Sequence, residues 1–178
     1  PSLPQELLGG CQLLADRQTL LERLPKRAVC AELGTQEGRF ASAIVRTTQP
    51  CEFHVVDLDL SQLECRDFLL ADPAVSLHEM DSAACLEQFP DHYFDWIYID
   101  ADHRYQAVRR DADVALRKIK PDGMLVFNDY IFWSHEEMVP YGVVAVVNEI
   151  CIQHDLAWAY FALNDSMYCD VALRRRSF

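Results

Sequence analysis

The sequence has few basic residues for its length. Sixteen Lys and Arg stand against 28 Asp and Glu in 178 residues, which gives a formal net charge of −12. A surface that binds nucleic acid or an anionic membrane needs clustered positive charge. The chain also lacks an apolar run long enough to span a bilayer. We therefore expect neither nucleic acid nor a membrane as a partner.

Paired cysteines are absent as well. The seven cysteines include no C-x-x-C pair, and their number is odd. This pattern predicts reduced thiols rather than disulfides or a zinc site. No signal-peptide pattern opens the chain. Together these absences predict a cytoplasmic protein.

Two common phosphate-binding motifs are missing. The dinucleotide fingerprint G-x-G-x-x-G is absent, because Glu32 stands where its first glycine would be. The phosphate loop G-x-x-x-x-G-K-[ST] is absent too. An NAD-dependent dehydrogenase is therefore disfavoured.

What the sequence does contain is a regular alternation of apolar strands and amphipathic helices. Strands are expected at about 28–31, 53–57, 75–80, 94–100, 124–127, 157–163 and 168–173. Helices are expected at about 40–45, 61–71, 82–88, 105–119 and 143–154, after an N-terminal helical segment in residues 1–25. Strict alternation predicts a Rossmann-like three-layer α/β/α sandwich. Its seven-stranded sheet would be mostly parallel, with an antiparallel strand at one edge. Residues 26–178 would form this core, and 1–178 a single domain.

The first expected strand runs into a glycine turn. The sequence there is Glu32-Leu33-Gly34-Thr35-Gln36-Glu37-Gly38, followed by a helix-like segment. Glycine has no Cβ and tolerates positive φ, so such a turn lets the backbone approach a ligand closely. A tight strand–helix turn without a ligand has the same pattern. The turn alone leaves both interpretations open.

Acidic residues end the expected strands, at Glu32, Asp57, Asp81, Asp100 and Asp129. Ligands of parallel sheets bind at the carboxyl ends of the strands. A group of carboxylates would repel a pyrophosphate and suits a polyhydroxylated or cationic ligand. Asp57, about twenty residues past the turn, is placed to accept hydrogen bonds from both hydroxyls of a ribose. These residues predict a nucleoside with a positively charged appendage.

Taken together, these motifs resemble the class I S-adenosylmethionine-dependent methyltransferases. The turn Glu32–Gly38 resembles their first motif. A small-molecule branch of them, methyltransferase family 24, has the pattern IDG-x-H-x-Y, then a helix, L-x-P-G-G and HDY. The residues that match are FDWIYIDADHRY at 94–105, Val108, Asp111, Pro121-Asp122-Gly123 and Asn128-Asp129-Tyr130. Departures are Ala101 and Asp122 for glycines and Asn128 for histidine.

The resemblance implies S-adenosyl-L-methionine as cofactor and assigns residues to it. They are Glu32, Gly34, Thr35, Gly38, Asp57, Leu58, Asp81, Ser82 and Asp100. Glu32 would face the amino group of the methionine part, and Asp57 would hold the ribose hydroxyls. Asp81 and Ser82 would lie beside the adenine. Asp100 would be closest to the methyl donor.

His103 and Asp100 are the candidate catalytic residues. Imidazole titrates near neutrality, so His103 could be the general base for an acceptor hydroxyl or amine. It could equally cap the following helix or orient Asp100. The similar catechol and caffeoyl-CoA O-methyltransferases hold a divalent ion at this place. Here Asp100, Asn128 and Asp129 would be its ligands, and oxygen ligands suit Mg²⁺ or Ca²⁺.

An aromatic loop follows the fifth core strand, and Tyr130, Trp133 and Tyr141 could form the acceptor pocket. Packing of the loop is the alternative role for these side chains. We expect an enzyme, a methyltransferase that modifies a small molecule at a hydroxyl oxygen. The alternative is a non-catalytic methyltransferase-like binding or regulatory module. With no inserted cap, the acceptor site would be open, or completed by the N-terminal helix or by the second subunit of a homodimer.

Overall fold

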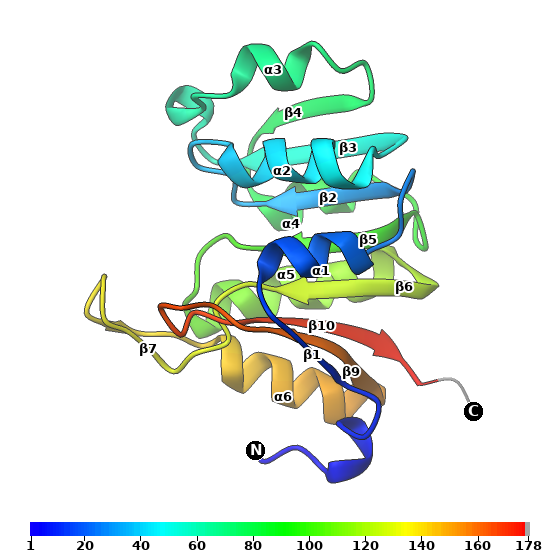
Figure 1. Ribbon diagram of the computed structural model, residues 1–178, viewed down its shortest axis with the longest axis vertical. Helices are drawn as coiled ribbons and strands as arrows, with labels where there is room; N and C mark the ends of the chain where they lie inside the picture. Colours follow the sequence, from blue (N-terminus) through cyan, green and yellow to red (C-terminus); the bar gives the residue numbers. More distant parts are fainter. Residues whose placement is uncertain (177–178) are drawn as a thin grey trace.

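The structure, a computed structural model that describes residues 1–176, is built on one eight-stranded sheet (Figure 1). Its strands are β1 (Gln12–Leu14), β2 (Val29–Leu33), β3 (Glu52–Asp57), β4 (Val75–Glu79), β5 (Phe94–Ile99), β6 (Ile119–Phe127), β9 (Leu156–Ala162) and β10 (Asp170–Arg175). They lie in the order β1-β9-β10-β6-β5-β2-β3-β4. A separate hairpin pairs β7 (Trp133–Ser134) with β8 (Val139–Pro140).

Neighbouring strands from β4 to β6 are all parallel, and β1 is parallel to β9. Strand β10 is antiparallel to both β6 and β9. The predicted Rossmann-like α/β fold with a mostly parallel sheet is confirmed. Two details differ from the prediction: the sheet has eight strands instead of seven, and the antiparallel strand lies inside it. A short connection returns β10 beside β9, and β10 then pairs with β6 on its other side, so β9 and β1 extend the sheet beyond it.

The N-terminal segment is only partly helical. It forms a 3-10 helix η1 (Gln5–Leu7), the edge strand β1 and the helix α1 (Arg17–Arg23). Gly9 and Gly10 stand where a continuous helix would have its interior, and glycine is a poor helix former. Asp16 begins α1 by accepting a hydrogen bond from the Thr19 amide at 2.6 Å. Leu7, Leu14 and Leu20 are buried from these three separate elements.

Three helices cover each face of the sheet. On one face lie α1, α2 (Arg39–Thr48) and α3 (Arg66–Leu70), with a 3-10 turn η2 (Leu60–Gln62). On the other lie α4 (Ser82–Glu87), α5 (Tyr105–Lys118) and α6 (Val143–His154). Strand β5 shows why two cores form. Trp96 and Tyr98 enter the first, whereas Ile97 and Ile99 enter the second, because successive side chains of a strand point to opposite faces.

This arrangement brings the carboxyl ends of β2, β3, β5 and β6 to one edge of the sheet. In Figure 1 the arrows of β2 and β6 point to the side on which the β7 hairpin projects. Within residues 1–176, no helix has both the length and the apolar character needed to cross a bilayer. The expected acids therefore meet at a single rim of the sheet.

Candidate active site

The glycine turn after β2 brings two strand ends into direct contact. Gly34 has φ +85°, and a Cβ there would lie 2.2 Å from the carbonyl oxygen of Asp100. The amide of Asp100 donates to the carbonyl of Leu33 at 2.8 Å. Gly38 has φ +79° and begins α2 at its N-cap position. The turn therefore depends on glycine for both conformation and space.

Asp57, at the end of β3, fixes this turn. Its Oδ2 accepts hydrogen bonds from the amides of Thr35 at 2.8 Å and Gln36 at 2.9 Å. Its Oδ1 accepts one from the amide of Asp59 at 3.1 Å. A carboxylate has about four lone-pair sites, so one of them stays available on Oδ1. The carboxylate thus holds the loop and can still accept from a ligand.

Two adjoining cavities lie along the rim. The first, of about 230 Å³, is lined by six of the predicted cofactor residues: Gly34, Asp57, Leu58, Asp81, Ser82 and Asp100. The second, of about 160 Å³, is lined by Glu32, Thr35, Arg17 and Phe40 together with Gly34 and Asp100. Gly34 and Asp100 belong to both cavities. Gly38 lines neither, since it lies beneath them against Leu63.

Glu32 is a buried carboxyl group with an unpaired oxygen. Its residue is 1% exposed, and Oε2 has no hydrogen-bond partner among residues 1–176. The hydroxyl of Thr35, in the same cavity, is also buried and without a partner in this part of the chain. Burial raises the pKa of Glu32 to about 8; the neighbouring Thr35 side chain opposes this shift, and the charge of Asp100 adds to it. Both unpaired atoms are positioned to contact a ligand.

Arg17 is a residue of this site that sequence reasoning missed. Its Nε lies 3.0 Å from Oδ2 of Asp170, and its Nη2 lies 2.6 Å from Oδ1 of Asn128. The guanidinium is centred 5.0 Å from the Phe40 ring. Among residues 1–176 its Nη1 makes no hydrogen bond, so one donor group remains for a ligand. Arg17 lies outside the motifs that carried the resemblance, so no pattern marked it.

The predicted metal ligands do not fit a divalent cation. Asn128 uses its side-chain oxygen to accept from Arg17 and is 5% exposed. Asp129 has the Arg17 guanidinium at 4.0 Å and Nε2 of His103 at 3.6 Å. The guanidinium of Arg17 and the imidazole of His103 thus lie against the oxygens that would bind Mg²⁺ or Ca²⁺.

His103 lies between two carboxylates. Its Nε2 is 3.5 Å from Oδ1 of Asp100 and 3.6 Å from Oδ2 of Asp129, is buried, and has no hydrogen-bond partner within residues 1–176. Burial alone would lower the pKa of His103, but the charges of Asp100 and Asp129 outweigh it, and the pKa is raised. The N-cap residue of α5 is Arg104, so His103 does not occupy the capping position.

A third cavity, of about 550 Å³, opens beside His103. It is lined by His103, Arg104, Glu137, Val139, Pro140 and Tyr141, and it shares Ala101 and Asp102 with the first cavity. The rings of Tyr141 and His103 stack with centroids 4.4 Å apart and planes 10° apart. The amide of Gly142 donates to the carbonyl of His103 at 2.7 Å, which joins the aromatic loop to this histidine.

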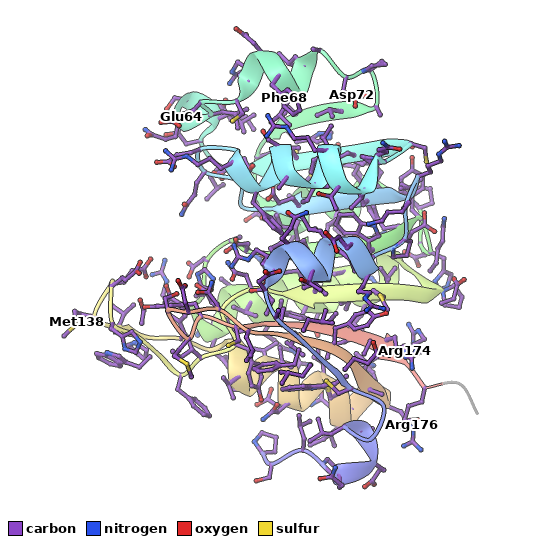
Figure 2. All side chains as sticks on the ribbon, in the orientation of Figure 1. Glu64, Phe68, Asp72, Met138, Arg174 and Arg176 are labelled. Carbon is purple, nitrogen blue, oxygen red and sulfur yellow. The ribbon has the colours of Figure 1, made fainter. Side chains whose placement is uncertain are left out.

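The other two predicted acceptor residues lie outside this cavity. The hydroxyl of Tyr130 donates to Oδ1 of Asn148 at 2.8 Å, and its ring packs edge-on against Trp158. Tyr130 therefore packs the loop down, the alternative left open by the sequence. Trp133 is 45% exposed on the β7–β8 hairpin, whose tip carries Met138 away from the body of the protein (Figure 2).

Asp81 is engaged in two interactions that the sequence did not predict. Its Oδ1 accepts from the Ala84 amide at 3.0 Å and caps α4, and its Oδ2 lies 2.6 Å from Nη2 of Arg110. Ser82, which begins α4, is 8% exposed and lines the first cavity. The rim next to Ser82 is completed by Asp111 of α5, a second residue that sequence reasoning did not assign to the site.

The strand order and the glycine turn define a Rossmann-like methyltransferase fold. A family described as a methyltransferase domain matches residues 31–130, and the chain belongs to this family. No match is found among curated proteins. The matched residues include the turn, β5 and the acids of the rim, but not Arg17.

Solved structures share this fold. One is 1,6-didemethyltoxoflavin-N1-methyltransferase of Burkholderia thailandensis, with bound 1,6-didemethyltoxoflavin and S-adenosylhomocysteine (14% identity, 90% of this chain and 76% of that chain, TM-score 0.68). Another is a SAM-dependent methyltransferase of Aquifex aeolicus (16% identity, 90% of this chain and 89% of that chain, TM-score 0.65). A third is the ribosomal protein L11 methylase of Lactobacillus delbrueckii subsp. bulgaricus (15% identity, 90% of this chain and 77% of that chain, TM-score 0.65). Since their acceptors range from a small molecule to a protein, the fold leaves the acceptor open.

Proposed function

We propose that the protein transfers a methyl group from S-adenosylmethionine to a hydroxyl oxygen of a small molecule. The nucleoside would occupy the first cavity, the amino-acid end the second, and the acceptor the third. The observation that carries the proposal is the unpaired, buried Oε2 of Glu32, directly beside Gly34 and Asp100. A buried carboxyl group without a partner is stabilised by a cationic ligand.

The residues of the second cavity suit an amino acid in its zwitterionic form. Glu32 and Asp100 would face its ammonium group, and the free Nη1 of Arg17 would face its carboxylate. Arg17 is already held in place by Asp170 and Asn128, so little side-chain freedom is lost on binding. In the first cavity, the free lone pair on Oδ1 of Asp57 would accept from a ribose hydroxyl.

When bound, S-adenosylmethionine supplies an electrophilic methyl group on a sulfonium centre. A neutral hydroxyl is a weak nucleophile, so the acceptor has to lose its proton as it attacks. Nε2 of His103 would take that proton, since it is buried, unpaired and at the border of the acceptor cavity. Asp100 and Asp129 would stabilise the resulting imidazolium. No step in this scheme uses a metal ion.

The third cavity supports a small acceptor. Its volume of about 550 Å³ lies in the usual range of small-molecule pockets. Tyr141 offers a flat aromatic wall next to the base, and Val139 and Pro140 add apolar surface. Glu137 and Arg104 supply a few polar groups at its edge. A compact hydroxylated ring would suit these walls.

The proposal is tested by binding and transfer measured on the same protein. S-adenosylhomocysteine should bind in a calorimetric titration, and methyl transfer from S-adenosylmethionine to a panel of phenols, sugars and amines should be detectable by mass spectrometry. His103→Ala should abolish transfer and retain S-adenosylhomocysteine binding. Binding without transfer to any acceptor would favour the non-catalytic binding module, and absence of binding would contradict the cofactor assignment itself.

A further inference from the structure

Asp111 is a buried carboxyl group that has no role in the proposed transfer. It lies in the first half of α5, is 2% exposed, and lines the first cavity next to Ser82 and Ala107. Its Oδ1 is buried and makes no hydrogen bond within residues 1–176. The cation beside it, Nε of Arg110, is 3.8 Å away, beyond hydrogen-bond distance. The wall of the first cavity thus contains a buried hydrogen-bond acceptor that has no donor among the described residues.

The neighbouring carboxylate of Asp81 differs from Asp111, because it already has a hydrogen bond on each of its oxygens. Each oxygen of Asp81 already accepts a hydrogen bond, one from the Ala84 amide and the other from Arg110. Asp81 therefore holds α4 and Arg110 in place at this end of the cavity. Asp111 is the carboxyl group there that still lacks a hydrogen bond on a buried oxygen.

We propose that Asp111 recognises the exocyclic 6-amino group of the adenine ring and so determines which nucleoside the cavity accepts. The inference rests on the proposed function. If Asp57 holds the ribose at the glycine turn, the base extends towards α4 and α5, where Ser82, Ala107 and Asp111 line the cavity. The amino group is the hydrogen-bond donor of adenine, and a carboxylate is an acceptor. A base with an oxygen at the same position would present a second acceptor and be rejected.

The charge of Asp111 is set by groups on three segments. Arg110 faces it from α5, Asp81 from the start of α4, and Asp102 from the loop before α5. Burial is the largest effect and raises the pKa of Asp111 to about 7, against the favourable charge of Arg110. The ionised form is the better acceptor for an amine. Recognition of the amino group should therefore strengthen as the pH rises from 6 to 8.

The test compares two ligands that differ only in the substituent at position 6 of the purine ring. They are S-adenosylhomocysteine and its analogue with hydrogen in place of the 6-amino group, each titrated calorimetrically into the full chain. Wild-type protein should bind S-adenosylhomocysteine about tenfold more tightly, the size expected for one charge-assisted hydrogen bond. The preference should be larger at pH 8 than at pH 6. Because both ligands carry the same amino acid, titration of Glu32 cancels in this ratio.

Two variants test whether Asp111 is responsible for the preference for S-adenosylhomocysteine over its analogue. Asp111→Leu should weaken S-adenosylhomocysteine and leave the analogue unchanged, so that the ratio falls to about one. Asp113→Leu is the matched control, because Asp113 lies on the same helix, pairs with Arg109, and does not line the cavity. It should keep the wild-type ratio.

Three results would overturn the inference. The first is equal affinity of the wild-type protein for S-adenosylhomocysteine and its analogue, a result that needs no variant and holds even if Asp111→Leu fails to fold. Equal weakening of both ligands in Asp111→Leu would indicate a structural role. If neither ligand binds wild-type protein, the proposed function fails as well, whereas the first two results leave it intact.

Discussion

Arg17 and Asp170 join the first helix to the last strand at the rim of the cofactor cavities. Nε of Arg17 lies 3.0 Å from Oδ2 of Asp170, which also accepts from the hydroxyl of Tyr98 at 2.7 Å. Asp170 is 1% exposed. The pair therefore closes the second cavity with a cation while it satisfies a buried carboxylate.

Replacement of Arg17 should affect stability and binding separately. Arg17→Leu should destabilise the protein by about 3 kcal/mol, because it leaves Asp170 buried without its partner. In the double variant Arg17→Leu/Asp170→Asn, urea unfolding should show most of that stability restored. Affinity for S-adenosylhomocysteine should stay low in both variants, whereas 5′-methylthioadenosine, which lacks the carboxylate, should bind as to wild type. Recovery of S-adenosylhomocysteine affinity in the double variant would contradict a direct contact with the carboxylate.

Gly34→Ala should abolish cofactor binding. The new Cβ would lie 2.2 Å from a backbone oxygen of Asp100, which is not a flexible side chain and cannot move away cheaply. The positive φ adds a strain of about 1–3 kcal/mol. Gly9→Ala is the control, since its Cβ would meet only the carbonyl of Gln5 at 3.9 Å. Calorimetry should show lost binding in the first variant alone, and full affinity in Gly34→Ala would show that the turn can relax.

Cofactor affinity should rise with pH between 6 and 8. The pKa of Glu32 is raised to about 8, so the free protein holds a proton there at neutral pH. A ligand ammonium group favours the ionised form, so binding releases this proton. Below the pKa, affinity should fall by up to about tenfold per pH unit. Titrations in buffers of different ionisation enthalpy measure the proton released, and Glu32→Gln should reduce both the release and the slope to the part expected from Asp111. Uptake of a proton on binding would refute this linkage.

Methyl transfer should require the neutral form of His103. Asp100 and Asp129 raise its pKa above 6.5, so kcat/KM should increase with pH through a value above 6.5 and then level off. His103→Gln should lower kcat/KM for the acceptor, measured at saturating S-adenosylmethionine, by about 100-fold or more and remove this rising limb. A pH profile unchanged in His103→Gln would assign the base to another group.

Metal removal should leave transfer unchanged. The guanidinium of Arg17 and the imidazole of His103 lie against the side chains of Asp100, Asn128 and Asp129 that would bind the ion. Transfer rates measured after dialysis against EDTA and after addition of Mg²⁺ or Ca²⁺ should agree within error. A rate that depends on added Mg²⁺ would show that Arg17 leaves this position in the active protein.

The sequence by itself determined the order of strands and helices, the glycine turn and the line of acids. Each depends on local sequence: burial on both faces makes β2, β3 and β5 mostly apolar, and the positive φ at position 34 requires glycine. Because the strands are parallel, their carboxyl ends lie at the same edge of the sheet, regardless of which side chains pack between them. The Rossmann-like fold and six of the residues that line the first cavity could therefore be predicted, and these six lie together.

Only the tertiary structure decided which side chains have partners. Arg17 meets Asp170 across 153 positions of the chain, Asp81 is used to cap α4, and Tyr130 packs on Trp158. Strand β1 is three residues long, too short to carry a period. Periodicity reports which face of an element is buried. It does not report which distant side chain fills the space opposite, so Arg17 and Asp111 became part of the site only once the helices were packed on the sheet.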